Sequence, residues 1–231
     1  MSDSELGSKL KLLKGFNEFR TDHYDDGVHS EEMRQLIDKQ NPKTLIISCS
    51  DSRVSPEIIF GADVGDIFGE QQVAALVMPY DKETVAQNSV AASVEYGIEH
   101  LGVEEVIVMG HTKCGGIQAL VNTVESCDDL RETPLSDAQE WVLNAKNVVL
   151  DAKASVIVND DLVKTIEEHS IIWSLNNLKN YPSIKAGLED GSVVARAWQF
   201  DLESGHVREY DEATGGFDAI DGQARDQALE V

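Results

Sequence analysis

The side chains best suited to chemistry occur in two short segments that are far apart in the chain. The first is Cys49-Ser-Asp-Ser-Arg53 and the second is His111-Thr-Lys-Cys114. Together they supply two thiols, an imidazole, a carboxylate and a guanidinium. Two thiolates and one imidazole, with a fourth position left for a carboxylate or water, form a tetrahedral zinc site. The sequence therefore predicts a single zinc site built from both segments.

A single cysteine or histidine has a simpler interpretation, because a lone cysteine is usually a small buried apolar residue and a lone histidine is usually a surface group. Here the two-residue gap between His111 and Cys114 lets one turn present both donors to one ion, and Cys49 ends a second strand. A phosphate loop is excluded, because Gly116 and Ile117 stand where its lysine and hydroxyl residue should be. The joint pattern favours a metal site.

Continuous β-favouring runs precede both segments, at 44–49 and 103–109. Such runs are typical of strands that are covered on both faces of a parallel sheet. A further short strand is predicted at 65–68, and apolar residues at helical spacing predict helices at 87–101, 117–124, 137–153 and 162–178. Alternating strands and helices indicate an α/β fold with a central, mainly parallel sheet flanked by helices. In such folds ligands bind beyond the carboxyl ends of the strands.

The two ends of the chain differ from its centre. Apolar residues at helical spacing in 5–20 and an N-cap at Ser30 predict an N-terminal helical arm at 1–39. The segments 193–200 and 207–210 predict a C-terminal strand hairpin. The sequence thus predicts one domain at 1–210 that includes the arm, followed by an acidic, mobile tail at 211–231.

The composition limits the partners. Nineteen Lys and Arg against 42 Asp and Glu give a formal charge of −23, which repels nucleic acids and anionic membranes, so we expect neither as a partner. The sequence has no apolar run of the roughly 18 residues that a membrane span needs, and no signal-peptide pattern at its start. Two of the three cysteines lie in the motifs, which favours metal binding in a reducing compartment over disulfides. We expect a cytoplasmic location.

The paired motifs, Cys49-Ser-Asp-Ser-Arg53 and Gly110-His-x-x-Cys-Gly-Gly116, resemble those of the β-class carbonic anhydrases. The resemblance extends from Gln40 to the predicted hairpin. It implies that Cys49, His111 and Cys114 are the zinc ligands. It also implies an enzyme that hydrates carbon dioxide reversibly to bicarbonate and a proton, by attack of a zinc-bound hydroxide.

The same resemblance assigns a catalytic dyad to Asp51 and Arg53. Asp51 either binds zinc as an exchangeable fourth ligand or pairs with Arg53 and leaves that position to water. The simpler interpretation is a local ion pair, which the catalytic interpretation also requires.

The resemblance further assigns three residues to the substrate pocket. Gln40 would donate a hydrogen bond to carbon dioxide or bicarbonate, and Phe68 and Tyr96 would form an apolar wall, although aromatic residues at such positions are more often part of the core. Because these groups come partly from a neighbouring subunit in the family, the resemblance implies a homodimer or a dimer of dimers. The N-terminal helix would be the arm that embraces the partner.

Beside the predicted site the sequence departs from the family. Gln71, Gln72 and Ala75 stand where arginine, asparagine and asparagine are usual, and Ile46 replaces a tryptophan. The tryptophan and arginine hold a non-catalytic bicarbonate in some members, so we expect that inhibitory pocket to be absent. Two alternatives stay open: a hydrolase of carbonyl sulfide or carbon disulfide, and a non-catalytic zinc-stabilised scaffold with Asp51 permanently on the metal. The intact Arg53 argues against the scaffold.

Overall fold

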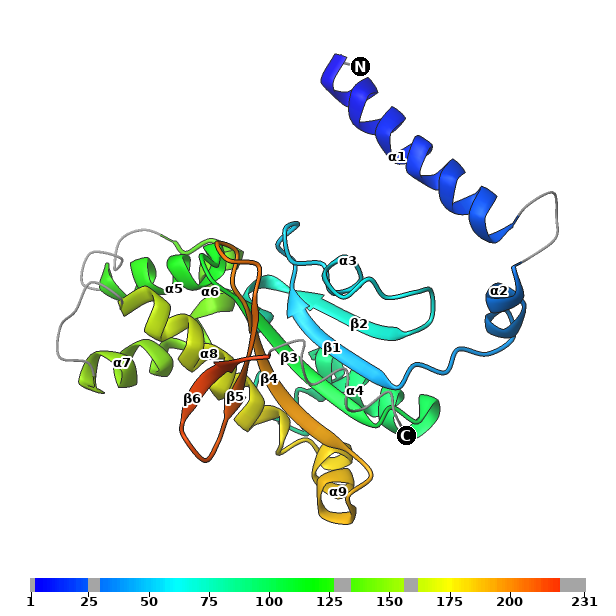
Figure 1. The fold of residues 1–231 in the computed structure, drawn as a ribbon. Coiled ribbons are helices and arrows are strands. Elements are labelled where there is room, and N and C mark those ends of the chain that lie inside the picture. The colour runs from blue at the N-terminus through cyan, green and yellow to red at the C-terminus, as the bar shows by residue number, and fades with distance from the viewer. Residues whose placement is uncertain (1–2, 25–29, 127–133, 156–161, 221–231) are drawn as a thin grey trace. The chain divides into compact units, whose positions relative to one another are not determined.

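The structure is a computed structural model of residues 1–231, and it describes all of them except 1–2, 25–29, 127–133, 156–161 and 221–231 (Figure 1). The chain divides into two compact units, 1–41 and 42–231, and each is described here by itself. In the described parts of the chain, no helix has the length and apolarity needed to cross a membrane.

The first unit consists of two helices, α1 (Asp3–His23) and α2 (Glu31–Leu36). The side chain of Ser30 accepts a hydrogen bond from the backbone N–H of Met33 at 3.2 Å, as expected of an N-cap. The helices of the predicted arm are therefore present, although the second ends earlier than the pattern suggested. Among the side chains of α1 that the structure describes, the larger apolar ones are exposed, namely Leu10, Leu12, Leu13, Phe16 and Phe19.

The second unit is built on a six-stranded sheet with the order β2-β1-β3-β4-β5-β6. The first four strands of that order are parallel, and β5 and β6 add to the edge as antiparallel strands. This mixed sheet, flanked by helices, confirms the predicted α/β class. The strands are β1 (Thr44–Cys49), β2 (Ile67–Gln72), β3 (Glu105–His111), β4 (Val194–Phe200), β5 (Val207–Asp211) and β6 (Gly216–Ala219).

The helices that the periodicity predicted in this unit are present, one of them in two pieces, and two further helices lie at 56–59 and 182–190. The expected helix at 137–153 is two helices, because Asn144 donates its side-chain amide to the carbonyl of Trp141 at 2.8 Å and ends the first of them. The α-helices are α3 (Pro56–Ile59), α4 (Ser89–Tyr96), α5 (Gly115–Glu125), α6 (Asp137–Leu143), α7 (Lys146–Ser155), α8 (Leu162–Leu178) and α9 (Pro182–Asp190). Shorter turns are η2 (Val73–Ala75), η3 (Val85–Gln87) and the π-turn η4 (Gly97–Leu101).

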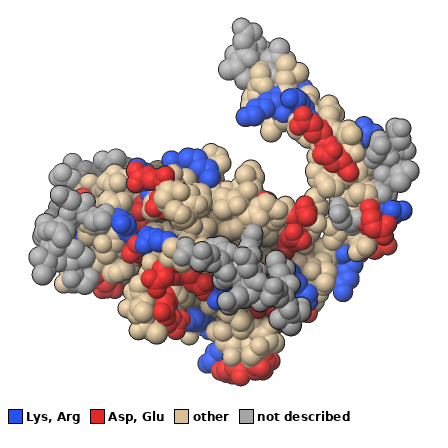
Figure 2. Space-filling view, in the orientation of Figure 1, with Lys and Arg blue, Asp and Glu red and all other residues tan. Residues whose placement is uncertain are grey.

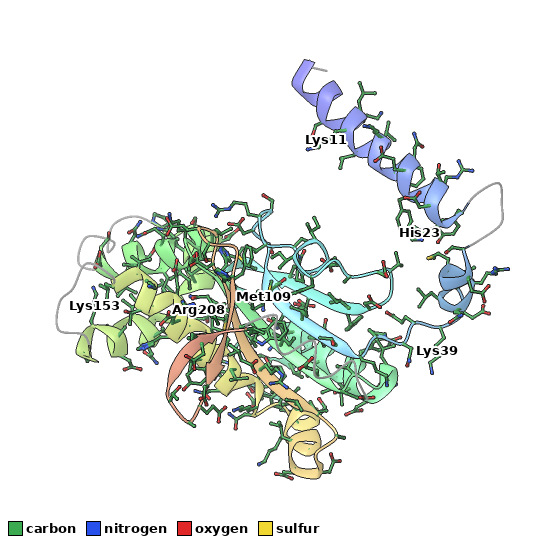
Figure 3. The ribbon with its side chains drawn as sticks, viewed as in Figure 1. Lys11, His23, Lys39, Met109, Lys153 and Arg208 are labelled. Atoms are coloured by element: carbon green, nitrogen blue, oxygen red, sulfur yellow. The ribbon has the colours of Figure 1, made fainter. Side chains whose placement is uncertain are left out.

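Side chains alternate between the two faces of the sheet. One face carries Leu45, Ile47 and Val108, which pack with apolar residues of α4, α8 and α9. The opposite face carries a smaller cluster, in which Ile46 and Met109, the latter labelled in Figure 3, pack with residues of α3 and with Trp198. The central strands are thus buried on both faces, as their continuous apolar sequences predicted.

The predicted hairpin of β4 and β5 is present, but the expected tail is wrong for residues 211–220. Gly216–Ala219 forms strand β6, which pairs with β5 through partners such as Tyr210 and Phe217. The rings of these two residues lie 5.4 Å apart between centroids. Their packing stabilises the pairing of β6 with β5, although residues 211–220 contain few other apolar side chains. The remaining residues, 221–231, lie outside the described part of the chain, as does Cys127.

Acidic side chains form several groups on the visible face, with basic side chains between them (Figure 2). Some basic residues lie in ion pairs, such as Lys43 with Glu104 at 2.6 Å and Arg208 with Glu168 at 2.7 Å. Because acids outnumber bases by 42 to 19, such pairs leave a large excess of negative charge.

Candidate metal centre

Two parallel strands and one helix bring the predicted ligands together. Cys49 ends β1, His111 ends the neighbouring parallel strand β3, and Cys114 is the N-cap of α5. Their donor atoms, two sulfurs and one ring nitrogen, all lie within 4.8 Å of one another, and all three side chains are buried. Two thiols and one imidazole at this separation are the donor set of a Cys₂His metal site.

The hydrogen bonds of His111 leave one ring nitrogen ready for a metal. Nδ1 lies 2.9 Å from the backbone carbonyl of Thr112, and because a carbonyl only accepts, Nδ1 carries the proton. Nε2 therefore has a free lone pair, yet it is buried and has no hydrogen-bond partner among the described residues. A buried nitrogen without a partner is costly unless another ligand satisfies it. A metal ion held by Nε2 would do so, and this is the usual arrangement of a ligating histidine.

The two thiols are coupled to each other. The pKa of Cys49 is lowered, chiefly because the thiol of Cys114 donates to its sulfur, with His111 adding to the effect against the opposing effect of burial. The pKa of Cys114 is raised, because its proton is held by Cys49 and because it is buried. Burial alone would lower the pKa of His111, but Cys49, the backbone of Thr112 and the charge of Asp51 together outweigh it, and the net shift is upward. The site thus concentrates negative charge on sulfur, which suits a divalent cation.

Asp51 and Arg53 form a two-pronged ion pair beside the donor atoms. Arg53 donates from Nε to Oδ1 at 2.9 Å and from Nη2 to Oδ2 at 2.7 Å, and its backbone N–H lies 3.0 Å from Oδ1. Oδ2 of Asp51 is also 4.0 Å from Nε2 of His111. The guanidinium holds the pKa of Asp51 well below its usual range, and the carboxylate in turn raises the pKa of Arg53. The carboxylate is therefore ionised and lies next to the unpartnered histidine nitrogen.

Of the three residues assigned to the pocket, the structure brings two together. The rings of Phe68 and Tyr96 lie 6.0 Å apart between centroids. Phe68 is half-buried, whereas Tyr96 is 46% exposed, so part of this aromatic surface is open to solvent. Gln40 belongs to the first unit and is exposed there, and its part in a pocket stays a prediction.

The segment that departs from the family lies directly beside Cys49. Gln72 is the register partner of Cys49, and its carbonyl accepts the backbone N–H of Ser50 at 3.0 Å. Ala74 and Ala75 follow with positive φ angles of 64° and 50°, a conformation that favours asparagine or glycine over alanine. The backbone of this segment thus contacts the site directly, whereas its side chains depart from the family pattern.

A residue that sequence reasoning missed lies behind the second motif segment. Glu167 of α8 is buried, and its Oε1 accepts the backbone N–H of Cys114 at 2.9 Å. The available signal was an acidic residue on the buried side of a helix, between Ile166 and Ser170. Acidic residues are rarely buried without a partner, so such a position predicts a polar contact without naming it.

Comparison with known proteins places these residues in a family. The family model described as carbonic anhydrase matches residues 44–207, which include both motif segments. The carbonic anhydrase of Synechococcus elongatus (strain ATCC 33912 / PCC 7942 / FACHB-805) is 31% identical over 214 residues, covering 91% of this chain and 75% of the relative. That of Synechocystis sp. (strain ATCC 27184 / PCC 6803 / Kazusa) is 31% identical over 223 residues, covering 95% of this chain and 77% of the relative.

Solved structures agree with this assignment. The β-carbonic anhydrase CcaA superposes with a TM-score of 0.79 at 28% identity, covering 95% of this chain and 94% of that one. A tetrameric β-carbonic anhydrase of Sordaria macrospora shares the fold, with a TM-score of 0.69 at 22% identity, covering 90% of this chain and 97% of that one. The chain therefore belongs to the β-carbonic anhydrase family.

Proposed function

We propose that this protein catalyses the reversible hydration of carbon dioxide to bicarbonate and a proton, with zinc as its metal. The observation that carries the proposal is the meeting, at one edge of the sheet, of the donors of Cys49, His111 and Cys114 with the ion pair of Asp51 and Arg53. Relatives that are 31% identical over nearly the whole chain are carbonic anhydrases, which supports the reaction.

Cys49, His111 and Cys114 would hold the metal. Two sulfurs and one imidazole nitrogen favour zinc over magnesium or calcium, which prefer oxygen ligands. A zinc ion there would act as a Lewis acid that lowers the pKa of a water molecule to about 7 and so makes a nucleophile available at neutral pH.

Asp51 and Arg53 would prepare that nucleophile. The ionised carboxylate can accept a hydrogen bond from the attacking water, which leaves a lone pair of its oxygen free to face the carbon of carbon dioxide. The guanidinium competes with the metal for the carboxylate, because it already binds both of its oxygens. Formation of the new C–O bond converts water and carbon dioxide to bicarbonate, and the released proton leaves to solvent or buffer.

The apolar surface of Phe68 and Tyr96 suits carbon dioxide, which has no net charge and accepts only weak hydrogen bonds. We assign Gln40 the hydrogen bond to a substrate or bicarbonate oxygen on the strength of the family resemblance. Exchange of Gln40 for alanine should then weaken bicarbonate binding and leave zinc content unchanged.

We further infer that the protein is a homodimer or a dimer of dimers, and that it works in the cytoplasm. The exposed apolar side chains of α1 support an assembly that covers them, and a fungal β-carbonic anhydrase with this fold is tetrameric. Both motif cysteines are free thiols, as a reducing compartment favours. Light scattering on the full chain and on a chain lacking residues 1–23 would test the assembly.

A stopped-flow assay of carbon dioxide hydration between pH 7 and 9, with zinc content measured alongside, tests the function. We expect hydration by the wild type and a loss on the order of 100-fold in Asp51→Asn with zinc retained. Asp66→Asn is the control, because Asp66 lies at the amino end of β2, whereas the proposed metal site lies at the carboxyl ends of β1 and β3. Full zinc occupancy without hydration would contradict the proposal, and assays with carbonyl sulfide and carbon disulfide would then separate a hydrolase from a scaffold.

A further inference from the structure

We propose that Glu167 is a positioning residue of the metal centre: its buried carboxylate fixes the backbone of Cys114 and thereby the direction of the Cys114 thiol. The inference rests on the proposed function, since it concerns one of the proposed zinc ligands. It is carried by the contact between Oε1 of Glu167 and the backbone N–H of Cys114, at 2.9 Å, between two residues that are each only 4% exposed.

The backbone of the second motif segment needs such support. Lys113 has a φ of +57°, a conformation that side-chain-bearing residues rarely adopt and that the surroundings must stabilise. Cys114 follows as the N-cap of α5, but its side chain makes no capping hydrogen bond. The backbone N–H groups at this helix end need acceptors, and the N–H of Cys114 itself has a buried one in Oε1 of Glu167. Glu167 supplies an acceptor there, and its negative charge suits the positive end of the helix dipole.

Glu167 is itself fixed by the packing of α8. Its helix contacts β3, and Ile171 on the next turn lies so close to that strand that a Cβ on Gly110 would come within 2.5 Å of its side chain. Gly110 directly precedes His111. The same helix therefore packs against the strand that carries one proposed ligand, and its Glu167 carboxylate accepts the backbone N–H of another. This arrangement sets the distance between the His111 ring and the Cys114 thiol.

A second anchor, that is, a second set of hydrogen bonds from outside the segment, supports His111–Cys114 at Thr112. The hydroxyl of Thr112 accepts the backbone N–H of Leu202 at 3.0 Å and donates to Oδ1 of Asp201 at 3.3 Å. Between the two anchors lies a cavity of about 550 Å³, whose lining includes Thr112, Lys113, Cys114 and Glu167. Without the carboxylate of Glu167, solvent in this cavity would be the remaining partner for the N–H of Cys114, and the segment would lose its rigid support on that side.

The charge and the burial of Glu167 indicate that the contact is made at a cost. Glu167 is buried, and moving a carboxylate out of water is unfavourable unless a partner satisfies it. An apolar residue would avoid this cost in a helix whose other buried side chains are neutral, namely those of Ile166, Ser170, Ile171, Ser174, Leu175 and Leu178. A buried acid at such a position is therefore better explained by the contact with the metal segment than by the stability of α8.

The test compares zinc release and cobalt spectra in four proteins: wild type, Glu167→Met, Glu167→Gln and Glu168→Gln. Methionine is close in size and removes the acceptor, whereas glutamine keeps an amide oxygen that can accept the N–H of Cys114. Glu168→Gln is the matched control, because it neutralises the next acid on the same helix, which pairs with Arg208 instead. Zinc release is followed after addition of a chelator, and the cobalt form reports thiolate geometry through its absorption bands.

We expect Glu167→Met to release zinc about tenfold faster or more and to show altered thiolate-to-cobalt bands. Glu167→Gln should restore most of the wild-type behaviour, and Glu168→Gln should match the wild type. A folded Glu167→Met protein with the wild-type release rate and spectrum would overturn the inference, as would equal defects in Glu167→Met and Glu168→Gln. If Glu167→Met does not fold, Glu167→Asp, which is one methylene shorter, takes its place with the same criteria. A wild type that binds no zinc would instead contradict the proposed function.

Discussion

Arg53 binds both carboxylate oxygens of Asp51 and also reaches the second motif segment. Its Nε and Nη2 lie 2.9 Å and 2.7 Å from the two oxygens, and Nη2 donates to the backbone carbonyl of Lys113 at 3.4 Å. One guanidinium thus orients the carboxylate and links the segment of Cys49 to that of Cys114.

This geometry predicts that Arg53→Lys lowers carbon dioxide hydration on the order of 100-fold at unchanged zinc content, because an ammonium group cannot make two parallel hydrogen bonds to one carboxylate. Stopped-flow rates and metal analysis would measure the two quantities. Arg196→Lys is a matched control, since Arg196 is another paired arginine of the same unit, with Glu105 and Glu209 as partners. A rate within about twofold of the wild type in Arg53→Lys would show that the two parallel hydrogen bonds to Asp51 are dispensable.

The lowered pKa of Asp51 predicts a pH dependence of stability. A carboxyl group with a lower pKa in the folded state than in the unfolded state adds stability above its unfolded pKa of about 3.9, and this stability is lost as the pH falls through the folded value. The metal-free Asp51→Asn protein should therefore be less stable than the wild type at neutral pH, by a margin that narrows below about pH 4. The effect should be small, because Arg53 is exposed and solvent screens the pair. Urea unfolding of both proteins in chelator, at neutral pH and below about pH 4, would measure the difference in stability. A difference that widened in acid would contradict the lowered pKa of Asp51.

Removal of zinc should destabilise the protein through the three proposed ligands. A ligand at about 100 times its dissociation constant stabilises the folded state by about 2.7 kcal/mol, so a chelator should lower the melting temperature of the wild type. His111→Ala should melt at the same temperature with and without the chelator, because one of three donors is lost. A melting temperature of the wild type that does not respond to chelation or to added zinc would argue against a bound metal.

Two adjacent glycines should respond differently to alanine. A Cβ on Gly116 would lie 2.9 Å from Cβ of Ala74 and 3.0 Å from Cγ1 of Val73, whereas a Cβ on Gly115 would meet nothing within 4 Å. Ala74 already has a positive φ, so the turn has little freedom to move away. Gly116→Ala should lower the free energy of unfolding by about 1–3 kcal/mol. Gly115→Ala, its matched control, should leave stability unchanged or raise it by about 0.5–1 kcal/mol. Denaturant unfolding would detect the difference, and equal effects of the two changes would refute the packing argument.

The inhibitory bicarbonate pocket should be absent. Ile46 is buried in an apolar cluster with Ile107 and Met109, and Gln71 provides no positive charge. Hydration rates measured at increasing bicarbonate should therefore follow simple product inhibition without cooperativity. The double variant Ile46→Trp with Gln71→Arg restores the family residues and serves as the comparison. Cooperative inhibition of the wild type by bicarbonate would contradict the prediction, because it would show a second bicarbonate site that needs neither the tryptophan nor the arginine.

The sequence by itself determined the donor chemistry and the main elements. Residue types and spacing within Cys49–Arg53 and His111–Cys114 predicted the cluster, because each segment follows a strand and parallel strands end at a common edge of the sheet. Helices such as α8 were predictable, since apolar periodicity is a local property of the chain. The family pattern added the pairing of Asp51 with Arg53.

Only the tertiary structure decided the contacts between segments that are distant in sequence. The N–H of Cys114 meets the carboxylate of Glu167, Gly116 packs against Ala74, and β6 completes the sheet beside β5. Each depends on how helices and strands pack after they form, and a buried acid or a glycine signals a constraint without naming its partner. Local sequence therefore determined what the metal centre contains, and packing decided what holds it in place.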